Sequence, residues 1–118
     1  MIRSTLMVLL LALSTLAFGQ NNRKGDFAAD GSSEGWTLGS GTGTRSYILF
    51  VKFEKPYDTA PTVLLSLTGH SGAAGKEGQI NVGVTAEKVT RDGFVIKVST
   101  WGDSKIHQVH GSWLAFGK

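Results

Sequence analysis

Apolar and polar residues alternate along most of the chain after residue 20, and this period of two predicts β-strands. In residues 46–54, Tyr47, Leu49, Val51 and Phe53 fall on one face, as a strand lying against a core requires. The same alternation recurs in four later segments: Val63 to Leu67, Ile80 to Ala86, Phe94 to Val98 and Val109 to Phe116. A weaker strand is expected around Asp26 to Ala29, so the total is about six strands.

Turn-forming residues separate the predicted strands, and no credible helix pattern occurs after residue 20. The turns are expected at Lys55-Pro56-Tyr57-Asp58, Gly69 to Gly78, Arg91-Asp92-Gly93 and Gly102-Asp103-Ser104. Asp92-Gly93 is the clearest hairpin signal, and the polar, glycine-rich segment from Gly69 to Gly78 is expected to be a flexible connection. The predicted fold is all-β, a six-stranded antiparallel β-sandwich.

The N-terminal segment has a different pattern. Arg3 precedes an apolar run from Leu6 to Leu13, and the small residues Ala17 and Gly19 follow. A charged start, an apolar middle and a small-residue cleavage site are typical of a secretory signal peptide. We therefore expect a signal peptide in residues 1–19 and one secreted, extracellular domain in residues 20–118. No membrane insertion is expected, because a transmembrane helix needs about 20 apolar residues.

Length and composition limit the classes of function. A chain of 118 residues holds one small domain, which excludes a multidomain enzyme. The sequence contains no cysteine, so strand pairing, the core and subunit contacts must supply the stability that disulfides give to many small secreted domains. The net charge is +3 and the basic residues are scattered singly, which argues against binding of nucleic acid.

No group of residues in the sequence predicts catalysis, a metal site or a cofactor. His107 and His110 are three residues apart, which in a regular strand puts them on opposite faces, so they cannot share a metal ion. The glycine-rich residues 39–43 lack the strand-loop-helix context of a phosphate-binding loop. The acidic residues are isolated, so no carboxylate pair indicates glycoside hydrolysis. An enzyme is therefore the least supported class.

Three apolar residues, Ile48, Phe50 and Leu64, fall on strand faces opposite the main apolar set. Two interpretations stay open. Loops cover these side chains, or they form a contact between subunits, because monomers rarely leave such residues clustered in water.

The tryptophans differ in their expected environments. Trp36 and Trp113 are expected in the core, whereas counting back along its strand puts Trp101 on the face opposite the core. The same count places Asn81 on an outward face. An exposed indole near amide, imidazole and hydroxyl groups suits a sugar, whose apolar face stacks on the ring while polar groups bind its hydroxyls. The alternative is a packing Trp101 that a loop covers.

Several short runs carry a resemblance to a known family: Val51 to Tyr57, Ala60 to Leu67, Gly93-Phe94, Ser99 to Trp101 and Gly111 to Ala115. In this order and spacing they resemble the H-type lectin domain, the family of snail agglutinins and of the C-terminal domain of slime-mould discoidins. The resemblance extends from about Gly25 to Phe116. It implies a six-stranded antiparallel β-sandwich that forms a homotrimer or homohexamer and binds N-acetylgalactosamine or galactose without catalysis.

The resemblance also implies site residues. Trp101 matches the tryptophan that lines the family's sugar site, and two polar positions follow it. A histidine falls where snail members carry a tyrosine, an asparagine falls where they carry an arginine, and the loop after the first tryptophan is shorter and has no acidic residue. The expected carbohydrate-binding residues are Trp101, Gly102, Asp103, His107, Asn81, Ser40 and Thr42.

The expected function is a secreted, multivalent lectin for glycans of the N-acetylgalactosamine or galactose type, acting in agglutination, adhesion or microbial recognition. Two alternatives stay open. One is an oligomeric adhesion or structural module that does not bind sugar. The other is a binder of acidic polysaccharides through Arg45, Lys52, Lys76, Lys88 or Lys97.

Overall fold

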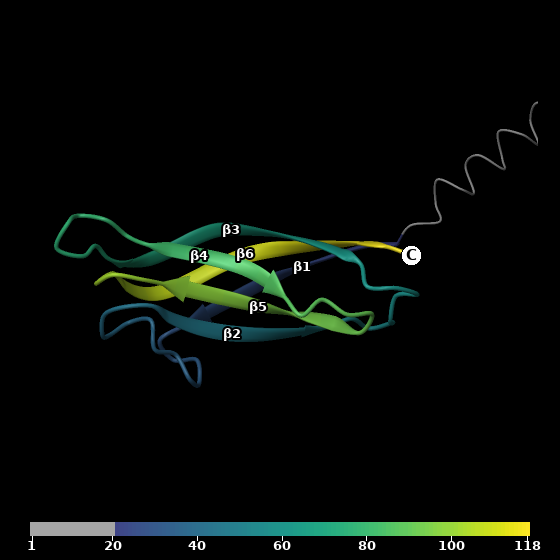
Figure 1. Cartoon of the computed structure of the whole chain (residues 1–118), viewed down its shortest axis with the longest axis horizontal. Helices are drawn as coiled ribbons and strands as arrows, with labels where there is room; N and C mark the ends of the chain where they lie inside the picture. The colour runs from purple at the N-terminus through teal and green to yellow at the C-terminus, as the bar shows by residue number, and fades with distance from the viewer. Residues whose placement is uncertain (1–20) are drawn as a thin grey trace, which may run out of the picture.

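A computed structural model describes residues 21–118, which form six β-strands and no α-helix (Figure 1). The strands are β1 (Asn21–Asp30), β2 (Arg45–Lys52), β3 (Thr62–Ala73), β4 (Val82–Glu87), β5 (Gly93–Thr100) and β6 (Lys105–Gly117). They pair antiparallel in two three-stranded sheets, in the orders β1-β6-β3 and β2-β5-β4. The sheets enclose one core, which confirms the predicted β-sandwich.

The predicted signal peptide, residues 1–19, lies outside the described residues. Within residues 21–118, no helix is long and apolar enough to cross a membrane.

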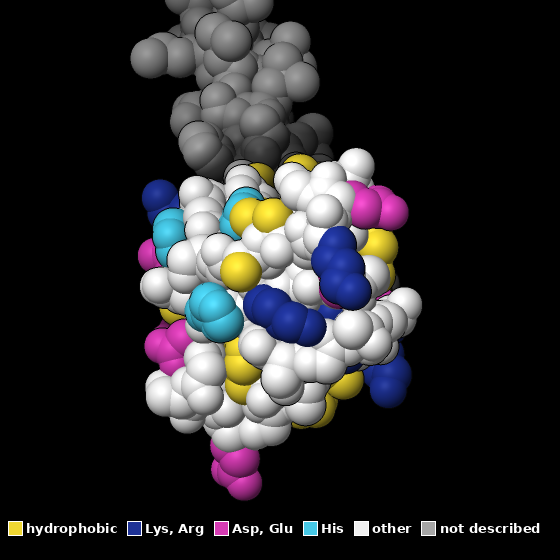
Figure 2. Space-filling view, turned by 90° about the vertical axis from the view of Figure 1, so that its left-hand side faces the viewer, with side chains coloured by type: hydrophobic (Ala, Val, Ile, Leu, Met, Phe, Trp, Pro, Cys, Tyr) yellow, Lys and Arg dark blue, Asp and Glu magenta, His cyan; other side chains and the backbone are white. Residues whose placement is uncertain are grey.

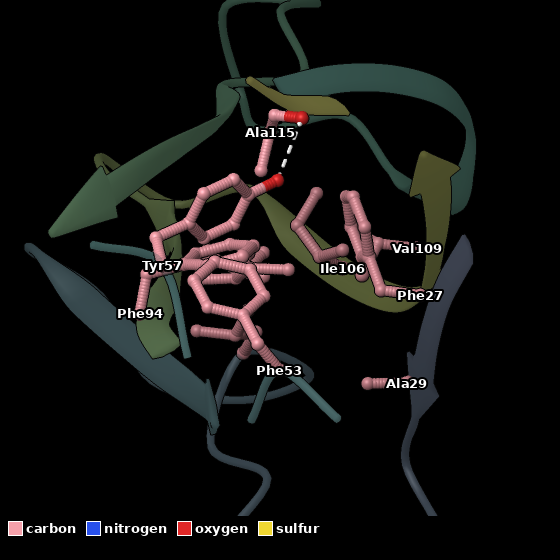
Figure 3. Packing of buried hydrophobic residues seen from close by; sticks show 11 residues of the cluster. Phe27, Ala29, Phe53, Tyr57, Phe94, Ile106, Val109 and Ala115 are labelled. Atoms are coloured by element: carbon pink, nitrogen blue, oxygen red, sulfur yellow. Dashed lines mark hydrogen bonds between the residues drawn. The ribbon is translucent and has the colours of Figure 1, made fainter. Parts of the chain in front are cut away.

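The inward-facing residues of both sheets pack into the core that the alternation predicts. Its fully buried members include Ile96 and Val98 of β5 and Ile106 and Val109 of β6. Near one end the core is aromatic: the ring centroids of Phe53 and Tyr57 are 5.1 Å apart, and those of Phe53 and Phe94 are 5.8 Å apart (Figure 3). The ring centroids of Phe94 and Trp113 are 5.4 Å apart.

Tyr57 connects the loop after β2 to the other sheet. Its buried hydroxyl lies 3.2 Å from the carbonyl oxygen of Ala115 in β6 and 3.0 Å from that of Asn21 in β1 (Figure 3). Trp36 and Trp113 are half-buried and pack against the core, as predicted. The Trp36 indole nitrogen also donates a hydrogen bond to the carbonyl oxygen of Ile106, at 3.0 Å.

The connections between strands gather at two ends of the sandwich (Figure 1). The β1–β2 loop (residues 31–44), the β3–β4 loop (74–81) and the β5–β6 turn (101–104) lie together at the left of Figure 1, which we call the Trp101 end. The β2–β3 loop (53–61) and the β4–β5 connection (88–92) lie at the opposite end, which we call the Tyr57 end.

The largest extensions beyond the predicted segments are in β1, β3 and β6, and β1 already begins at Asn21 instead of near Asp26. β3 continues to Ala73, so the prediction of a turn beginning at Gly69 was wrong, and β6 begins at Lys105 instead of near Val109. Gly69 lies inside the strand, where its lack of a side chain leaves room for a neighbour. It pairs with His110, and a side chain at Gly69 would overlap with the His110 imidazole. A glycine that makes room for a neighbour looks like a turn residue in the sequence.

A β-bulge interrupts the alternation of β6 at His107, which has no partner on β3. As a result Ile106 and Val109, three residues apart, are both buried, and His107 and His110 are both exposed. The prediction that the two histidines lie on opposite faces was therefore wrong, because it assumed a regular strand, and a bulge adds one residue to the period.

The outward apolar residues are not covered by loops. Phe50 is 84% exposed, Leu64 is 54% exposed and Ile48 is 48% exposed. Phe50 pairs with Val95 on one sheet, and Leu64 pairs with Leu114 on the other, so each sheet carries an apolar patch on its outer face. The interpretation that loops cover these residues was wrong.

Gly111 of β6 has no room for a side chain between β1 and β3, the two strands that flank β6 in its own sheet. A Cβ there would overlap with the carbonyl oxygen of Ser66 and would lie 2.7 Å from the Cε1 atom of Phe27. Because the carbonyl belongs to a paired strand, it cannot move aside cheaply. Gly111→Ala is expected to lower the free energy of unfolding by about 1–3 kcal/mol in urea denaturation.

Gly31→Ala is the matched control, because no atom lies within 4 Å of a Cβ at this exposed turn position. The control should change the free energy of unfolding by less than about 0.5 kcal/mol. Equal effects of the two substitutions would contradict the packing argument.

Candidate functional site

Trp101 begins the turn that links β5 to β6, and its side chain is 45% exposed. Next to it, Gly102 has a φ of 70°, in the left-handed region that favours glycine and reverses the chain direction. The indole lies beside Gly83 of β4, where a Cβ would be 3.8 Å from the ring. The ring is therefore accessible at the surface of the Trp101 end, as the count along β5 predicts, and no loop covers it.

Two buried hydroxyls hold Asn81 beside Trp101. The Thr100 hydroxyl donates to the Asn81 carbonyl oxygen at 2.6 Å, and the Ser104 hydroxyl accepts from the Asn81 backbone amide at 2.9 Å. The Asn81 side-chain nitrogen in turn donates to the Trp101 carbonyl oxygen at 3.2 Å. Asn81 is half-buried, and among residues 21–118 its amide oxygen has no hydrogen-bond partner.

A shallow pocket of about 290 Å³ lies between the β3–β4 loop and the β5–β6 turn. Asp103 lies on one side of the pocket. Its Oδ2 atom accepts a hydrogen bond from the Lys76 backbone amide at 3.0 Å, which connects the β5–β6 turn to the β3–β4 loop. Loop 74–81 is thereby tied to the turn, so this part of the segment predicted to be a flexible connection is anchored by a carboxylate. The pocket is lined by Gly75, Lys76, Glu77, Gln79, Asn81, Gly102 and Asp103.

Arg45, the first residue of β2, joins the third loop to this turn. Its guanidinium donates to the carbonyl oxygens of four residues: Ser40 at 2.6 Å, Ser104 at 2.9 Å, Gly43 at 3.0 Å and Gly102 at 3.3 Å. The Gly43 amide also donates to the Gly102 carbonyl oxygen at 2.8 Å. Lys105 donates a further hydrogen bond to the carbonyl oxygen of Gly41. Arg45 therefore acts as a clamp that holds loop 40–43 against the turn.

Ser40 and Thr42 are exposed on the loop that this clamp holds. His107 is exposed beside the same loop, since a Cβ on Gly39 would lie 3.5 Å from its Nδ1 atom. All the predicted site residues are thus at the Trp101 end, but only Asn81, Gly102 and Asp103 line one pocket. Their part in binding a ligand stays a prediction.

The charges at this end are dispersed. Figure 2 shows basic side chains near its middle, histidines to one side and acidic side chains toward its edge. At the start of the β1–β2 loop, hydrogen bonds from the hydroxyl and the backbone amide of Ser32 lower the pKa of the Asp30 carboxyl. Within residues 21–118, no three His, Cys, Asp or Glu side chains lie close enough to hold a metal ion. The end offers an exposed ring and hydrogen-bonding groups, which suit a ligand rich in hydroxyls.

Sequence reasoning missed the part that three residues have in shaping this site: Thr100, Ser104 and Arg45, of which Arg45 was considered only as a contact for acidic polysaccharides. The sequence does indicate the role of Thr100. The alternation that buries Ile96 and Val98 also points Thr100 inward, and a buried hydroxyl needs a hydrogen-bond partner. Arg45 follows a glycine-rich loop, but nothing in the sequence indicates which carbonyl oxygens its guanidinium reaches.

A family model described as the H-type lectin domain matches residues 48–116, which span most of β2 and all of β3 to β5, together with Trp101 and nearly all of β6. The chain belongs to the H-type lectin domain family. The resemblance found in the sequence is thereby confirmed, and the chain is a carbohydrate-binding domain of the lectin class.

Solved structures with this H-type lectin architecture include discoidin II of Dictyostelium discoideum. The native recombinant protein has a TM-score of 0.73 and 24% sequence identity, over 84% of this chain. The wild-type protein has a TM-score of 0.74 and 24% identity, over 85% of this chain. The chain spans only 37% of the length of each discoidin chain, and at this identity the likeness shows the fold alone.

A curated relative is known from Fuscovulum blasticum under the name "ATP synthase subunits region ORF 7". It is 37% identical over 92 residues, which cover 78% of this chain and 74% of that protein.

The hydrogen bonds of Arg45 are expected to limit the mobility of loop 40–43 and of the β5–β6 turn. Arg45→Gln removes the guanidinium that holds loop 40–43 to the turn, so the backbone amides of residues 39–44 and 101–104 should exchange with solvent about ten-fold faster or more. Hydrogen exchange followed by mass spectrometry or NMR measures this, and the Gly43 amide reports on it directly.

Arg91→Gln is the control, because Arg91 donates one comparable hydrogen bond, at 2.8 Å, to the Tyr57 carbonyl oxygen at the opposite end. It should leave exchange at the Trp101 end unchanged. Unaltered exchange in Arg45→Gln would show that the loop holds its position without the clamp.

Proposed function

We propose that this domain is a secreted lectin that binds glycans of the N-acetylgalactosamine or galactose type at its Trp101 end, without catalysing a reaction. The observation that carries the proposal is the exposed Trp101 indole next to the pocket lined by Asn81, Gly102 and Asp103. Family membership supports carbohydrate binding in general. Secretion is supported by the signal-peptide pattern of residues 1–19.

The available groups suit a galactose ring. Its axial 4-hydroxyl leaves the C–H groups of carbons 3, 4 and 5 on one face, and this apolar face can lie against the Trp101 indole. The Asp103 carboxylate and the Asn81 amide oxygen are acceptors for sugar hydroxyls or for the N–H of an acetamido group. Because hydrogen bonds within the chain already fix Asn81 and Asp103, binding need not order them.

A single site is expected to bind weakly. Asn81 is neutral at the position where the resemblance implies an arginine, and losing a charge-assisted hydrogen bond costs about 1.5–3 kcal/mol, or one to two orders of magnitude in affinity. Linked sites raise the overall affinity by about 10²–10⁴-fold. Binding in an oligomer therefore suits agglutination, adhesion or microbial recognition, where many copies of one glycan are displayed together.

The outer apolar patches support assembly into a homotrimer or homohexamer. Phe50 and Ile48 form one exposed patch on the β2-β5-β4 sheet, beside the buried Val95 that pairs with Phe50. A phenylalanine that is 84% exposed adds apolar surface that a partner subunit would remove from water.

Two of the five basic residues considered for acidic polysaccharides have partners within the chain. The guanidinium of Arg45 binds carbonyl oxygens within the chain, and Lys97 lies 3.9 Å from Glu87 in an ion pair. A module for adhesion without sugar binding stays an alternative, and a glycan array on which the protein binds nothing would favour it.

Trp101→Ala is expected to weaken binding of N-acetylgalactosamine by about ten-fold or more in isothermal titration calorimetry, because the sugar loses its stacking surface. Trp101→Phe keeps an aromatic ring and should retain most of the affinity. Unchanged binding by Trp101→Ala would remove this residue from the site.

Analytical ultracentrifugation at micromolar concentration is expected to give the mass of a trimer or hexamer. Phe50→Lys should shift the mass toward the monomer, because a contact patch then has to bury a charge. Leu114→Lys alters the patch on the other sheet, and retention of the mass in that variant would assign the contact to the β2 face. A monomeric native protein would contradict the assembly.

A further inference from the structure

A second recess opens at the Tyr57 end, away from the site described above. It has a volume of about 530 Å³ and is lined by Arg23, Lys24, Lys52, Phe53, Glu54, Lys55 and Trp113. β1 is an edge strand of one sheet and β2 is an edge strand of the other, so the recess lies along an open side of the sandwich between them. The turn that carries Trp101 lies at the other end (Figure 1).

The lining of this recess is strongly basic. Four of its residues carry a positive charge, namely Arg23, Lys24, Lys52 and Lys55, whereas Glu54 carries the one negative charge. Among residues 21–118, none of the four cations lies within ion-pair distance of a carboxylate, and the ion pair found there is Lys97 with Glu87. The recess therefore has a net positive charge, with four cations against one acid, and none of the four cations is held in an ion pair within residues 21–118.

Arg23 is fixed in the wall of the recess. Its guanidinium carbon lies 4.4 Å from the centre of the Tyr57 ring and 5.8 Å from that of the Phe53 ring, and a guanidinium nitrogen donates to the Lys55 carbonyl oxygen. Stacking on two rings positions a cation in advance, so its ordering costs little when an anion arrives.

The floor of the recess is aromatic. Trp113 of β6 is half-buried and pairs with Gly25 of β1. Gly25 leaves space for the indole, because a Cβ on Gly25 would lie 2.6 Å from the Trp113 ring. Trp113 packs on Phe53, with ring centroids 6.1 Å apart. The recess thus combines a ring surface with cations on its rim, which suits a ligand that has both an apolar face and an acidic group.

We propose that this recess binds an acidic saccharide, one whose sugar ring bears a sulfate or a carboxylate, with Lys24, Lys52 and Lys55 contacting the anionic group and Trp113 facing the ring. Its volume lies within the range of about 300–1,000 Å³ that is typical of small-ligand pockets. A flat lipid surface would not reach into such a recess, whereas one or two sugar rings fill it. The proposal does not depend on the sugar site at the Trp101 end.

The probe is dextran sulfate, with uncharged dextran as its matched control, titrated calorimetrically into the intact protein. The protein should bind dextran sulfate and not dextran, and the affinity should fall as salt is raised from 0.05 to about 0.3 M, because salt screens exposed charges. Lys24→Gln/Lys52→Gln should weaken binding by about ten-fold. Both side chains are exposed, and a thermal melt verifies that the variant is folded.

The matched control is Lys76→Gln/Lys97→Gln, which removes the same charge outside the recess and should change the affinity by less than about two-fold. Trp101→Ala should bind dextran sulfate like the native protein, which separates this site from the one at the Trp101 end. Equal losses in the two double variants would overturn the proposal in favour of a diffuse charge effect, and so would the absence of binding. Tighter binding to phosphatidylglycerol vesicles, lost in Lys24→Gln/Lys52→Gln, would assign the recess to lipid headgroups instead.

Discussion

The position of the candidate site depends on the packing of β5 against β6. Each is the central strand of its sheet, and their inward residues, among them Ile96, Val98, Ile106 and Val109, are fully buried between the two layers. These strands are consecutive in the chain, so the turn of residues 101–104 must cross from one sheet to the other at the end of the core. A crossing this short leaves the Trp101 ring outside the packed layers, and β4 carries Gly83 where the indole lies.

The turn between the two sheets has carbonyl oxygens that the strands do not pair, and the guanidinium of Arg45 donates hydrogen bonds to them. The carbonyl oxygens of Gly102 and Ser104 lie in the turn between β5 and β6, outside the strand ladder; Ser104 is buried, and a buried carbonyl needs a partner. Arg45 supplies those partners and takes up two carbonyls of the glycine-rich loop as well. Because a guanidinium carries several donors in a fixed plane, one residue can hold two flexible segments in one geometry. The exposed surface at this end is therefore built on an ordered backbone.

The strands and the exposure of Trp101 were predictable from the sequence, because both follow from the period of two that an uninterrupted strand imposes. The errors arise where that period breaks. The bulge at His107 and the close approach at Gly69 depend on the partner strand, which the local sequence does not show. A glycine inside a strand is also easily mistaken for a turn residue, because turns are rich in glycine. The contacts of Arg45 link residues up to 59 positions apart and leave no local pattern. The lining of the recess at the Tyr57 end is equally scattered, since it comes from the edge strands β1 and β2, the loop after β2 and the central strand β6.

The two proposed sites and the proposed assembly use different parts of the surface. The apolar patches of Phe50 and of Leu64 with Leu114 lie on the outer faces of the two sheets, whereas the Trp101 pocket and the basic recess lie toward opposite ends. A contact made through the sheet faces would remove the apolar side chains from water and leave the loops of the Trp101 end open. Every subunit would then keep a surface of mixed charge for a neutral sugar and a basic surface for an acidic one. An oligomer built in this way could engage two kinds of glycan on one surface, and each added contact would raise the overall affinity without any change in a single site.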